Sequence, residues 1–265
     1  MEEIPGTQYR LSGNVHWNGA FGRRLPDIFD FYKVQGIIMD RRTMLKASAL
    51  SLGAAAMGIQ TADAAAAAKV KEGEISVKRY TNEFFYDKDG KFLEERARQA
   101  FYEMFEAYHY PLNDFIEKNI WFVDFGLGDF ANVGMGGIFF INRRDYRYFS
   151  HDIYLLPGQM IPEHRHLPTE EAPAKMESWH VRYGTVYNWS EGEETVPAIS
   201  TPPASQKDTI VCKQCELLVP GDIRHLGNLE KWHFLQAGPN GTIVTESATY
   251  HDGAGLRFSN PKAQM

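Results

Sequence analysis

The sequence predicts a mainly β protein, an antiparallel β-barrel or jelly roll preceded by N-terminal helices. From residue 120 to 265, short apolar or alternating runs are separated by Gly and Asp, the pattern of strands joined by turns. No helical period interrupts these runs, which favours an antiparallel sandwich or barrel. Residues 67–119 instead contain a segment with helical spacing. The chain has 265 residues, 43% of them hydrophobic, and this is enough for a real core.

The charge balance excludes two classes of partner. The chain carries 28 Lys and Arg against 34 Asp and Glu, a formal net charge of −6. A protein that binds nucleic acid or an anionic membrane through its surface charge carries a basic patch or stripe, and this composition gives none. We therefore expect no nucleic-acid partner.

Residues 39–66 resemble a twin-arginine export signal. Arg41 and Arg42 precede an apolar, Ala-rich segment from Ala47 to Gln60, and small residues follow at 62–64. The apolar segment is too short to cross a bilayer comfortably, so we expect no membrane span in the mature protein. The signal predicts the export machinery as a partner and a periplasmic or otherwise exported location. A buried Ala-rich helix is the alternative interpretation.

Residues 1–38 have scattered Gly, Pro and aromatic residues without a sustained period. Signals of this type lie close to the true start of a protein, so we interpret this segment as an upstream, non-native extension and Met39 as the initiator. Sequencing the N-terminus of the exported protein tests this hypothesis.

Residues 67–119 form the predicted N-terminal helical segment. Between Lys91 and Tyr108 the apolar residues fall on one stripe at helical spacing, and Pro111 limits the helix. A shorter helix is expected from Phe115 to Lys118. Such an aromatic stripe is far more often a packing face than a binding site.

The predicted barrel occupies residues 120–265. A polar stretch, Ser190–Asp208, is rich in Glu, Pro, Ser and Thr and reads as a solvated loop or wide hairpin. The runs with strand character are Trp121–Phe130, Gly134–Arg143, Asp152–His166, Glu177–Trp189, Thr209–Val219, Trp232–Gly238 and Gly241–Tyr250.

The stretch from Gly158 to Gly184 carries a candidate metal site. His164 and His166 are two residues apart, and because side chains alternate in a strand, both point the same way. With Glu177 and a later histidine they make a mixed nitrogen and oxygen site, suited to Mn²⁺, Fe²⁺, Co²⁺, Ni²⁺ or Zn²⁺. The alternative is a pair of histidines satisfied by hydrogen bonds on a strand.

This stretch resembles the first cupin motif: a glycine, five residues, His-x-His, a gap, Glu, six residues and a glycine. The gap of ten residues, Leu167–Met176, is longer than usual in cupins, so we expect it to bulge out as a loop. The resemblance implies a cupin fold for the barrel.

Nearly all of the chain after Lys91 further resembles the cupin-type D-lyxose isomerases. The resemblance depends on Trp121–Arg143, on the metal stretch and on Pro220–Pro261, and the block Asp124–Phe130 (DFGLGDF) is its most particular part. It implies a metal-dependent enzyme that interconverts aldoses and ketoses, D-lyxose with D-xylulose and D-mannose with D-fructose.

Carried over by position, the resemblance makes His164, His166, Glu177 and His233 the metal ligands. The usual proline and glycine before the fourth histidine are absent here, which leaves His225 as a rival to His233.

The resemblance also matches Lys175, just before the ligand Glu177, and Glu246, a carboxylate near the sugar. Isomerisation removes the C2 proton of the sugar, and a divalent metal assists by polarising the carbonyl and stabilising the enediolate. Four protein ligands leave two positions of an octahedral ion for a bidentate sugar, which favours Mn²⁺ over tetrahedral Zn²⁺.

Two of these residues suit the proton chemistry. Glu246, with a pKa raised by partial burial, is the expected base that moves the proton from C2 to C1. Lys175 is expected to hold or protonate a sugar oxygen and to favour the developing oxyanion. The alternatives are a glutamate on the surface of a strand and a solvated lysine in a loop.

Other residues are assigned by their positions. His251 with Asp252, and Arg257, are expected to close over the sugar, whereas His180 lies three residues past Glu177 and faces the opposite side of the strand. The remaining aromatic candidates either pack on the sugar or fill the barrel, and packing is favoured; they are Trp179, Tyr183, Trp232 and Phe234.

Three points stay open. Cys212 and Cys215 form a C-x-x-C that is either a disulfide or two spectator thiols, and redox catalysis is disfavoured because no βαβ context surrounds it. Cupins often pair, so a homodimer is possible. The alternative functions for the same fold are an iron-dependent dioxygenase and a non-catalytic sugar-binding protein.

Overall fold

The computed structural model describes residues 75–265. Contacts divide the chain into two units, Met1–Ala68 and Lys69–Met265, and the described residues belong to the second. The predicted upstream extension and export signal, residues 1–38 and 39–66, lie outside the described residues, as does the start of the helical segment. Within residues 75–265 no helix is long and apolar enough to cross a membrane.

Within residues 75–265 three α-helices precede the strands: α2 (Asn82–Phe85), α3 (Glu94–Ala107) and α4 (Asp114–Asn119). The sequence predicts α3 and α4, whereas the short helix α2 was not predicted. Helix α3 begins with two glutamates, whose negative charges interact favourably with the positive end of the helix dipole. Helix α4 begins at Asn113, whose side chain accepts hydrogen bonds from the Phe115 and Ile116 amides.

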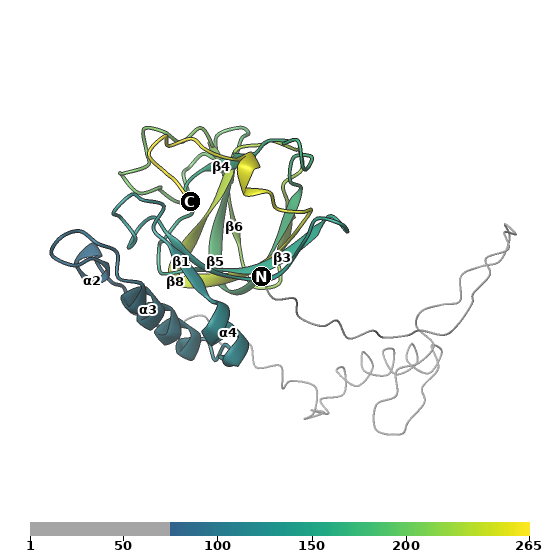
Figure 1. Ribbon diagram of the computed structural model, residues 1–265. Coiled ribbons are helices and arrows are strands. Elements are labelled where there is room, and N and C mark those ends of the chain that lie inside the picture. Colours follow the sequence, from purple (N-terminus) through teal and green to yellow (C-terminus); the bar gives the residue numbers. More distant parts are fainter. Residues whose placement is uncertain (1–74) are drawn as a thin grey trace, which may run out of the picture. The chain divides into compact units, whose positions relative to one another are not determined.

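The prediction of a mainly β, antiparallel fold is confirmed. All nine strands of the described part of the chain belong to one sheet, in the order β1-β2-β3-β8-β4-β9, with β5 pairing β8, β6 and β7. The sheet curls round on itself (Figure 1). The strands are β1 (Trp121–Val123), β2 (Met135–Arg143), β3 (Tyr148–Leu155), β4 (His164–His166), β5 (Glu177–Ser190), β6 (Gln214–Leu218), β7 (Ile223–His225), β8 (His233–Ala248) and β9 (Leu256–Phe258).

The bounds differ from the sequence prediction at several strands. The run Asp152–His166 is two strands, β3 and β4, and the two runs from Trp232 to Tyr250 form one strand, β8. The run from Trp121 to Phe130 is a strand only up to Val123, because turns follow in which Phe125, Gly126 and Gly128 have positive φ. Strands β7 and β9 have three residues each and lack the alternation that would reveal them. No helix or strand interrupts the chain between β5 and β6, as expected for the polar stretch, or between β4 and β5.

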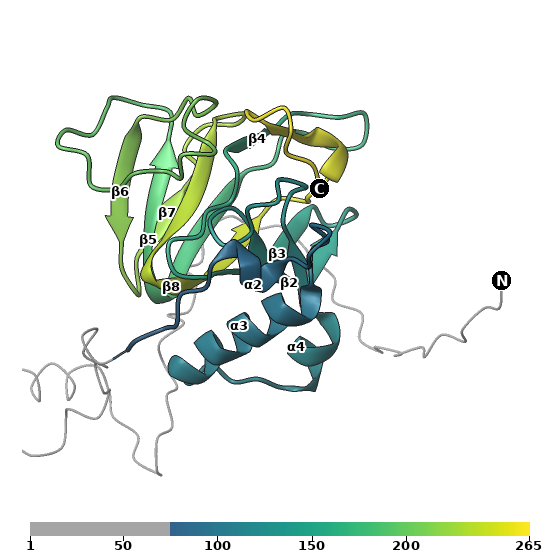
Figure 2. The ribbon, with the colours of Figure 1, turned by 90° about the vertical axis from the view of Figure 1, so that its left-hand side faces the viewer.

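The side chains of strand β3 alternate between the inner face of the sheet, which lines the pocket, and its outer face. His151 and Ile153 line the inner pocket, whereas Asp152 and Tyr154 point outward and contact Tyr110, which follows α3. Helices α3 and α4 lie on this outer side (Figure 2). The apolar stripe of α3 is buried there, as the sequence predicts, by Ala97, Ala100, Phe101, Met104 and Phe105.

The two long strands, β5 and β8, bend where alternation breaks. Leu235 and Glu246 both line the pocket although they are eleven positions apart, an odd offset that would place them on opposite faces of a regular strand. The reason is that the pairing of β5 with β8 is irregular between Val181 and Val186. Gly184 and Gly241 have positive φ at this bend, and a Cβ on Gly184 would collide with the Gly241 carbonyl. Close approach of the two backbones therefore requires glycine.

The two cysteines are free and buried. The Cys212 thiol donates a hydrogen bond to the Trp232 carbonyl, with 3.2 Å between sulfur and oxygen. Burial raises the pKa of both thiols, that of Cys215 to about 12, so neither is a ready nucleophile. The described structure corresponds to the spectator thiols rather than to the disulfide.

Candidate active site

Three histidines from two strands meet at one end of the pocket. His164 and His166 lie on β4, and the pairing of β4 with β8 sets His164 directly opposite His233. One nitrogen from each ring lies within 4.8 Å of the other two, a separation that suits a metal ion. The three imidazoles can thus hold one ion, and His233 rather than His225 completes the group.

Backbone contacts set the orientation of two of these rings. His164 Nδ1 donates to the Pro162 carbonyl at 2.9 Å, and His233 Nδ1 donates to the Lys231 carbonyl at 2.8 Å. A donating Nδ1 leaves Nε2 as the nitrogen with a lone pair. Nε2 of His166 and of His233 are buried and have no hydrogen-bond partner, as expected for atoms that bind an ion.

Glu177 lies beside the histidines at the start of β5. Its Oε1 is 3.4 Å from His166 Nε2 and 3.1 Å from His233 Nε2, and it has no hydrogen-bond partner. Its Oε2 accepts a hydrogen bond from Lys175 Nζ at 3.0 Å. One oxygen therefore faces the histidines while the lysine holds the other.

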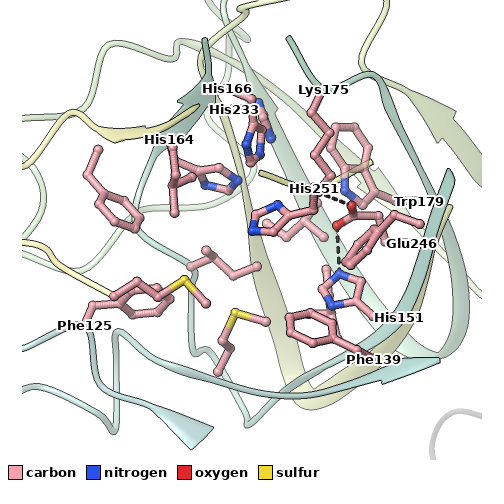
Figure 3. Close-up of a pocket in the computed structure, with 18 of the residues that line it drawn as sticks. Phe125, Phe139, His151, His164, His166, Lys175, Trp179, His233, Glu246 and His251 are labelled. Carbon is pink, nitrogen blue, oxygen red and sulfur yellow. Dashed lines mark hydrogen bonds and ion pairs between the residues drawn. The ribbon is translucent and has the colours of Figure 1, made fainter. Parts of the chain in front are cut away.

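A buried polar chain continues from Glu177 into the pocket. The Lys175 ammonium contacts Glu177. It also contacts Glu246, whose second oxygen lies 2.9 Å from His151 Nε2, as the dashed lines in Figure 3 show. Each of these side chains is at most 7% exposed. Lys175 comes from the predicted loop between β4 and β5, yet it is buried rather than solvated.

The neighbouring charges explain why Lys175 and Glu246 are both ionised. Burial alone would lower the pKa of Lys175, but Glu177 and Glu246 outweigh it and raise the pKa, so the lysine stays charged. For Glu246, burial alone would raise the pKa, but Lys175 outweighs it and the pKa lies below its usual range. The expected raised pKa of Glu246 is therefore wrong for this structure, because the ammonium is in direct contact.

The imidazoles near the lysine are mostly neutral. Burial lowers the pKa of His164 to about 3 and that of His251 to about 4, and burial and Lys175 also lower the pKa of His166. In His233 the charge of Glu177 outweighs burial and raises the pKa. Neutral imidazole is the form that binds metal ions.

Apolar and aromatic side chains form the rest of the pocket. Figure 3 shows Phe139 and Trp179 beside the Glu246–His151 pair, and Phe125 below His164. A concave, largely apolar pocket with a few convergent polar groups is typical of a small-molecule site. Its other lining residues are Trp121, Met135, Phe149, Ile153, Ile161, Leu235, His251, Leu256, Phe258 and Met265.

No protein-family model matches the sequence. The chain is 34% identical over 169 residues to a D-lyxose/D-mannose isomerase from Thermosediminibacter oceani, a match that covers 63% of this chain and 91% of the relative. It is 34% identical over 170 residues to a D-lyxose ketol-isomerase from Cohnella laeviribosi, with 63% and 91% covered. A third relative, a D-lyxose ketol-isomerase from a Thermofilum species, is 30% identical over 174 residues, with 66% and 95% covered.

The chain belongs to the D-lyxose isomerase family. Membership confirms the prediction of a sugar isomerase over the dioxygenase and the non-catalytic binding protein. The fold is also that of a solved L-ribose isomerase from Cellulomonas parahominis, with a TM-score of 0.50, 15% identity, and coverage of 68% of this chain and 95% of that one. At this identity the likeness concerns the fold alone.

Six of the residues predicted for this isomerase site lie together. They are His164, His166, Lys175, Glu177, His233 and Glu246. His180 faces away from Glu177, as expected. The alternative assignment of His225 as the fourth ligand is wrong, because His225 is exposed on β7, where its Nδ1 forms a hydrogen bond with the Ser178 hydroxyl at 2.8 Å.

Two predicted sugar contacts are corrected. Leu256 and Phe258 line the pocket, so the alternation of β9 turns Arg257 outward, where its side chain is exposed and donates to the Ala254 and Leu256 carbonyls. Asp252 accepts hydrogen bonds from Thr169 and from the Ala254 amide. It links the loop after β4 to the 3-10 helix η1 (Gly253–Gly255) and does not line the pocket.

His251 lines the pocket, as expected, although its neighbour Asp252 does not. The backbone of His251 forms two hydrogen bonds with the Asn142 side chain. Sequence reasoning missed His151, whose only signal was its place in the strand that contains Ile153 and Leu155. Of the aromatic candidates, Trp179 lines the pocket, and the others pack outside it. Tyr183 packs with α3, Phe234 stacks on Trp189, and Trp232 lies under the Arg165 guanidinium.

Proposed function

We propose that this isomerase interconverts D-lyxose with D-xylulose and D-mannose with D-fructose by proton transfer through an enediol. The names of the relatives support these sugars. The observation that carries the proposal is the buried chain that joins the histidine cluster to Glu246, because it sets a carboxylate base beside a group able to hold a metal.

We further propose that His164, His166, Glu177 and His233 hold a divalent metal, with Mn²⁺ favoured and Co²⁺, Fe²⁺, Ni²⁺ or Zn²⁺ as alternatives. The residues fit this group, since three buried atoms without a partner converge, Nε2 of His166 and His233 and Oε1 of Glu177. A divalent ion bound there would polarise the sugar carbonyl and favour loss of the C2 proton.

Glu246 takes the proton from C2 and returns it to C1. Its carboxylate is ionised in the free protein because Lys175 is in contact, so it is ready to accept a proton. When the proton arrives, Lys175 remains paired to Glu177 and keeps a positive charge beside the sugar oxygens.

The experiment is incubation of purified protein with D-lyxose, D-mannose and D-xylulose in D₂O, with argon replacing oxygen. We expect isomerisation with deuterium entering at C1 of the ketose formed from D-lyxose or D-mannose and at C2 of the aldose formed from D-xylulose. We also expect elemental analysis of the active protein to find a transition metal. Protein that is active without such a metal would contradict the metal proposal, and the absence of turnover on all three sugars would contradict the substrates.

We also propose export of the protein by the twin-arginine route to the periplasm and assembly of a homodimer. The paired arginines at 41 and 42 support the first, and the frequent pairing of cupins supports the second. Fractionation of cells that make the full chain and sedimentation of the mature chain test them. Protein found only in the cytoplasmic fraction, or a monomer at micromolar concentration, would contradict them.

A further inference from the structure

His151 has a contact that the proposed proton transfer does not use. Its Nε2 lies 2.9 Å from Glu246 Oε2, and the two residues face each other across β3 and β8. Its Nδ1 is buried, has no hydrogen-bond partner, and belongs to a ring that lines the pocket. Phe139 and Phe149 pack against the ring, with centroids 5.5 and 4.7 Å away, and fix its orientation.

The neighbours of His151 decide which nitrogen carries its proton. Because the Lys175 ammonium contacts Glu246, that carboxylate is ionised and can only accept a hydrogen bond. His151 must therefore donate through Nε2, and its Nδ1 carries a lone pair. A buried lone pair without a donor indicates a ligand that donates to it, and in a sugar site that ligand is a hydroxyl group.

Sugars also require a step before C2 can lose its proton. Aldopentoses and aldohexoses such as D-lyxose and D-mannose exist in water mainly as six-membered hemiacetal rings, in which C1 is not a carbonyl. Opening the ring moves a proton from the C1 hydroxyl to the ring oxygen, and both oxygens are attached to C1. A single ring nitrogen can therefore serve both.

We propose that His151, held by Glu246, opens the pyranose ring of the substrate. Nδ1 accepts the proton of the C1 hydroxyl, the C1–O bond of the ring breaks with its electron pair on the ring oxygen, and that oxygen takes the proton back. A carbonyl forms at C1, and no oxidant or reductant is needed. Glu246 stabilises the transient imidazolium and stays a carboxylate, ready for the C2 proton. This inference rests on the proposed isomerase function.

His251 provides a matched control. It lines the same pocket, and its Nδ1 is also buried without a hydrogen-bond partner, but no carboxylate accepts a hydrogen bond from its ring among the described contacts. Without such a partner a transient imidazolium is not stabilised. We therefore assign ring opening to His151 and hydroxyl binding to His251.

The test separates ring opening from C–H chemistry in the variants His151→Gln, His251→Gln and Glu246→Gln. Glutamine can still donate to Glu246 but cannot relay a proton. Aldose turnover is measured with D-lyxose, and exchange of the C1 protons of D-xylulose with D₂O is followed by proton NMR. D-Xylulose cannot form a six-membered ring and exists partly as the open ketone, so its exchange does not require the ring-opening step.

We expect His151→Gln to lower kcat/KM for D-lyxose at least about a hundredfold while C1 exchange stays within a few fold of wild type. His251→Gln should lower both rates in the same proportion. If His151→Gln lowers D-lyxose turnover and D-xylulose exchange equally, the ring-opening role is overturned and His151 only positions Glu246. If it lowers neither rate, His151 has neither role. If Glu246→Gln keeps both rates, it is the proposed base that fails. Metal content and melting temperature show that each variant is folded, and His151→Asn replaces His151→Gln if that variant does not fold.

Discussion

Two polar networks lie back to back on the same pair of strands. On the inner face His151 pairs with Glu246, and one residue along each strand, on the outer face, Asp152 accepts a hydrogen bond from Thr245 at 2.6 Å. The Tyr110 hydroxyl donates to the other Asp152 oxygen at 2.8 Å. The two networks share the same two strands, but the inner side chains are fully buried, whereas Tyr110 and Thr245 of the outer network are half-buried.

They differ in how completely their polar atoms are paired. Each oxygen of Asp152 accepts a hydroxyl, and Tyr110 also contacts the Tyr154 hydroxyl at 3.0 Å. On the inner face Nδ1 of His151 and Oε1 of Glu177, among others, have no hydrogen-bond partner. A network that only supports the fold is complete by itself, whereas a network that binds a ligand keeps atoms for that ligand. Incomplete pairing therefore separates the site from its structural counterpart.

The largest effect on activity should come from the inner network. Glu246→Gln removes the proposed base while keeping the shape, and general base catalysis is worth about 10²–10⁴-fold, so kcat should fall by about that factor. The melting temperature should change little, and bound metal measured by elemental analysis should be unchanged. Activity within tenfold of wild type would remove Glu246 from this role.

The largest effect on stability should come from the outer network. Asp152→Ala removes the acceptor of two half-buried hydroxyls, those of Tyr110 and Thr245, each at about 1–3 kcal/mol, so the free energy of unfolding should fall by a few kcal/mol. Denaturant titration measures this change. The folded fraction should keep the wild-type kcat, because Asp152 faces away from the pocket, and a loss of kcat as large as that of Glu246→Gln would contradict the separation of the two faces.

Metal removal should act on the inner network alone. Saturation at a hundred times Kd stabilises a folded protein by about 2.7 kcal/mol, so a chelator should lower the melting temperature and abolish turnover, and Mn²⁺ should restore both. In His166→Ala the melting temperature should no longer respond to the chelator, whereas in Asp152→Ala it should respond as in wild type. An equal response in His166→Ala would indicate that the metal binds elsewhere.

The smallest effect should come from Tyr110→Phe. It removes one hydroxyl from the outer network while Asp152 keeps its bond from Thr245, so the expected loss of stability is about 1 kcal/mol. Burial raises the pKa of Tyr110, so the hydroxyl is a neutral donor at any working pH and the loss should not depend on pH between 6 and 9. A loss as large as that of Asp152→Ala would show that this hydroxyl, and not the carboxylate, holds the network together.

Much of the site follows from local sequence. His164 and His166 needed only the alternation of one strand, and Glu177 and Lys175 lie within the same stretch. His151 could not be predicted, because its role depends on the pairing register of β3 with β8, which joins residues 95 positions apart. Arg257 was assigned wrongly because β9 is too short to show which of its faces is buried.

The sequence by itself determined the strand-rich fold class, the apolar stripe of α3 and the shared face of His164 and His166, because spacing along one strand or helix fixes which side chains share a face. The tertiary structure decided the rest. Only the curling of the sheet brings His233 opposite His164, buries Lys175 between two carboxylates and turns His151 inward beside an outward Asp152. These contacts arise from strand pairing and from the bends at Gly184 and Gly241, which depend on packing between distant segments rather than on local pattern.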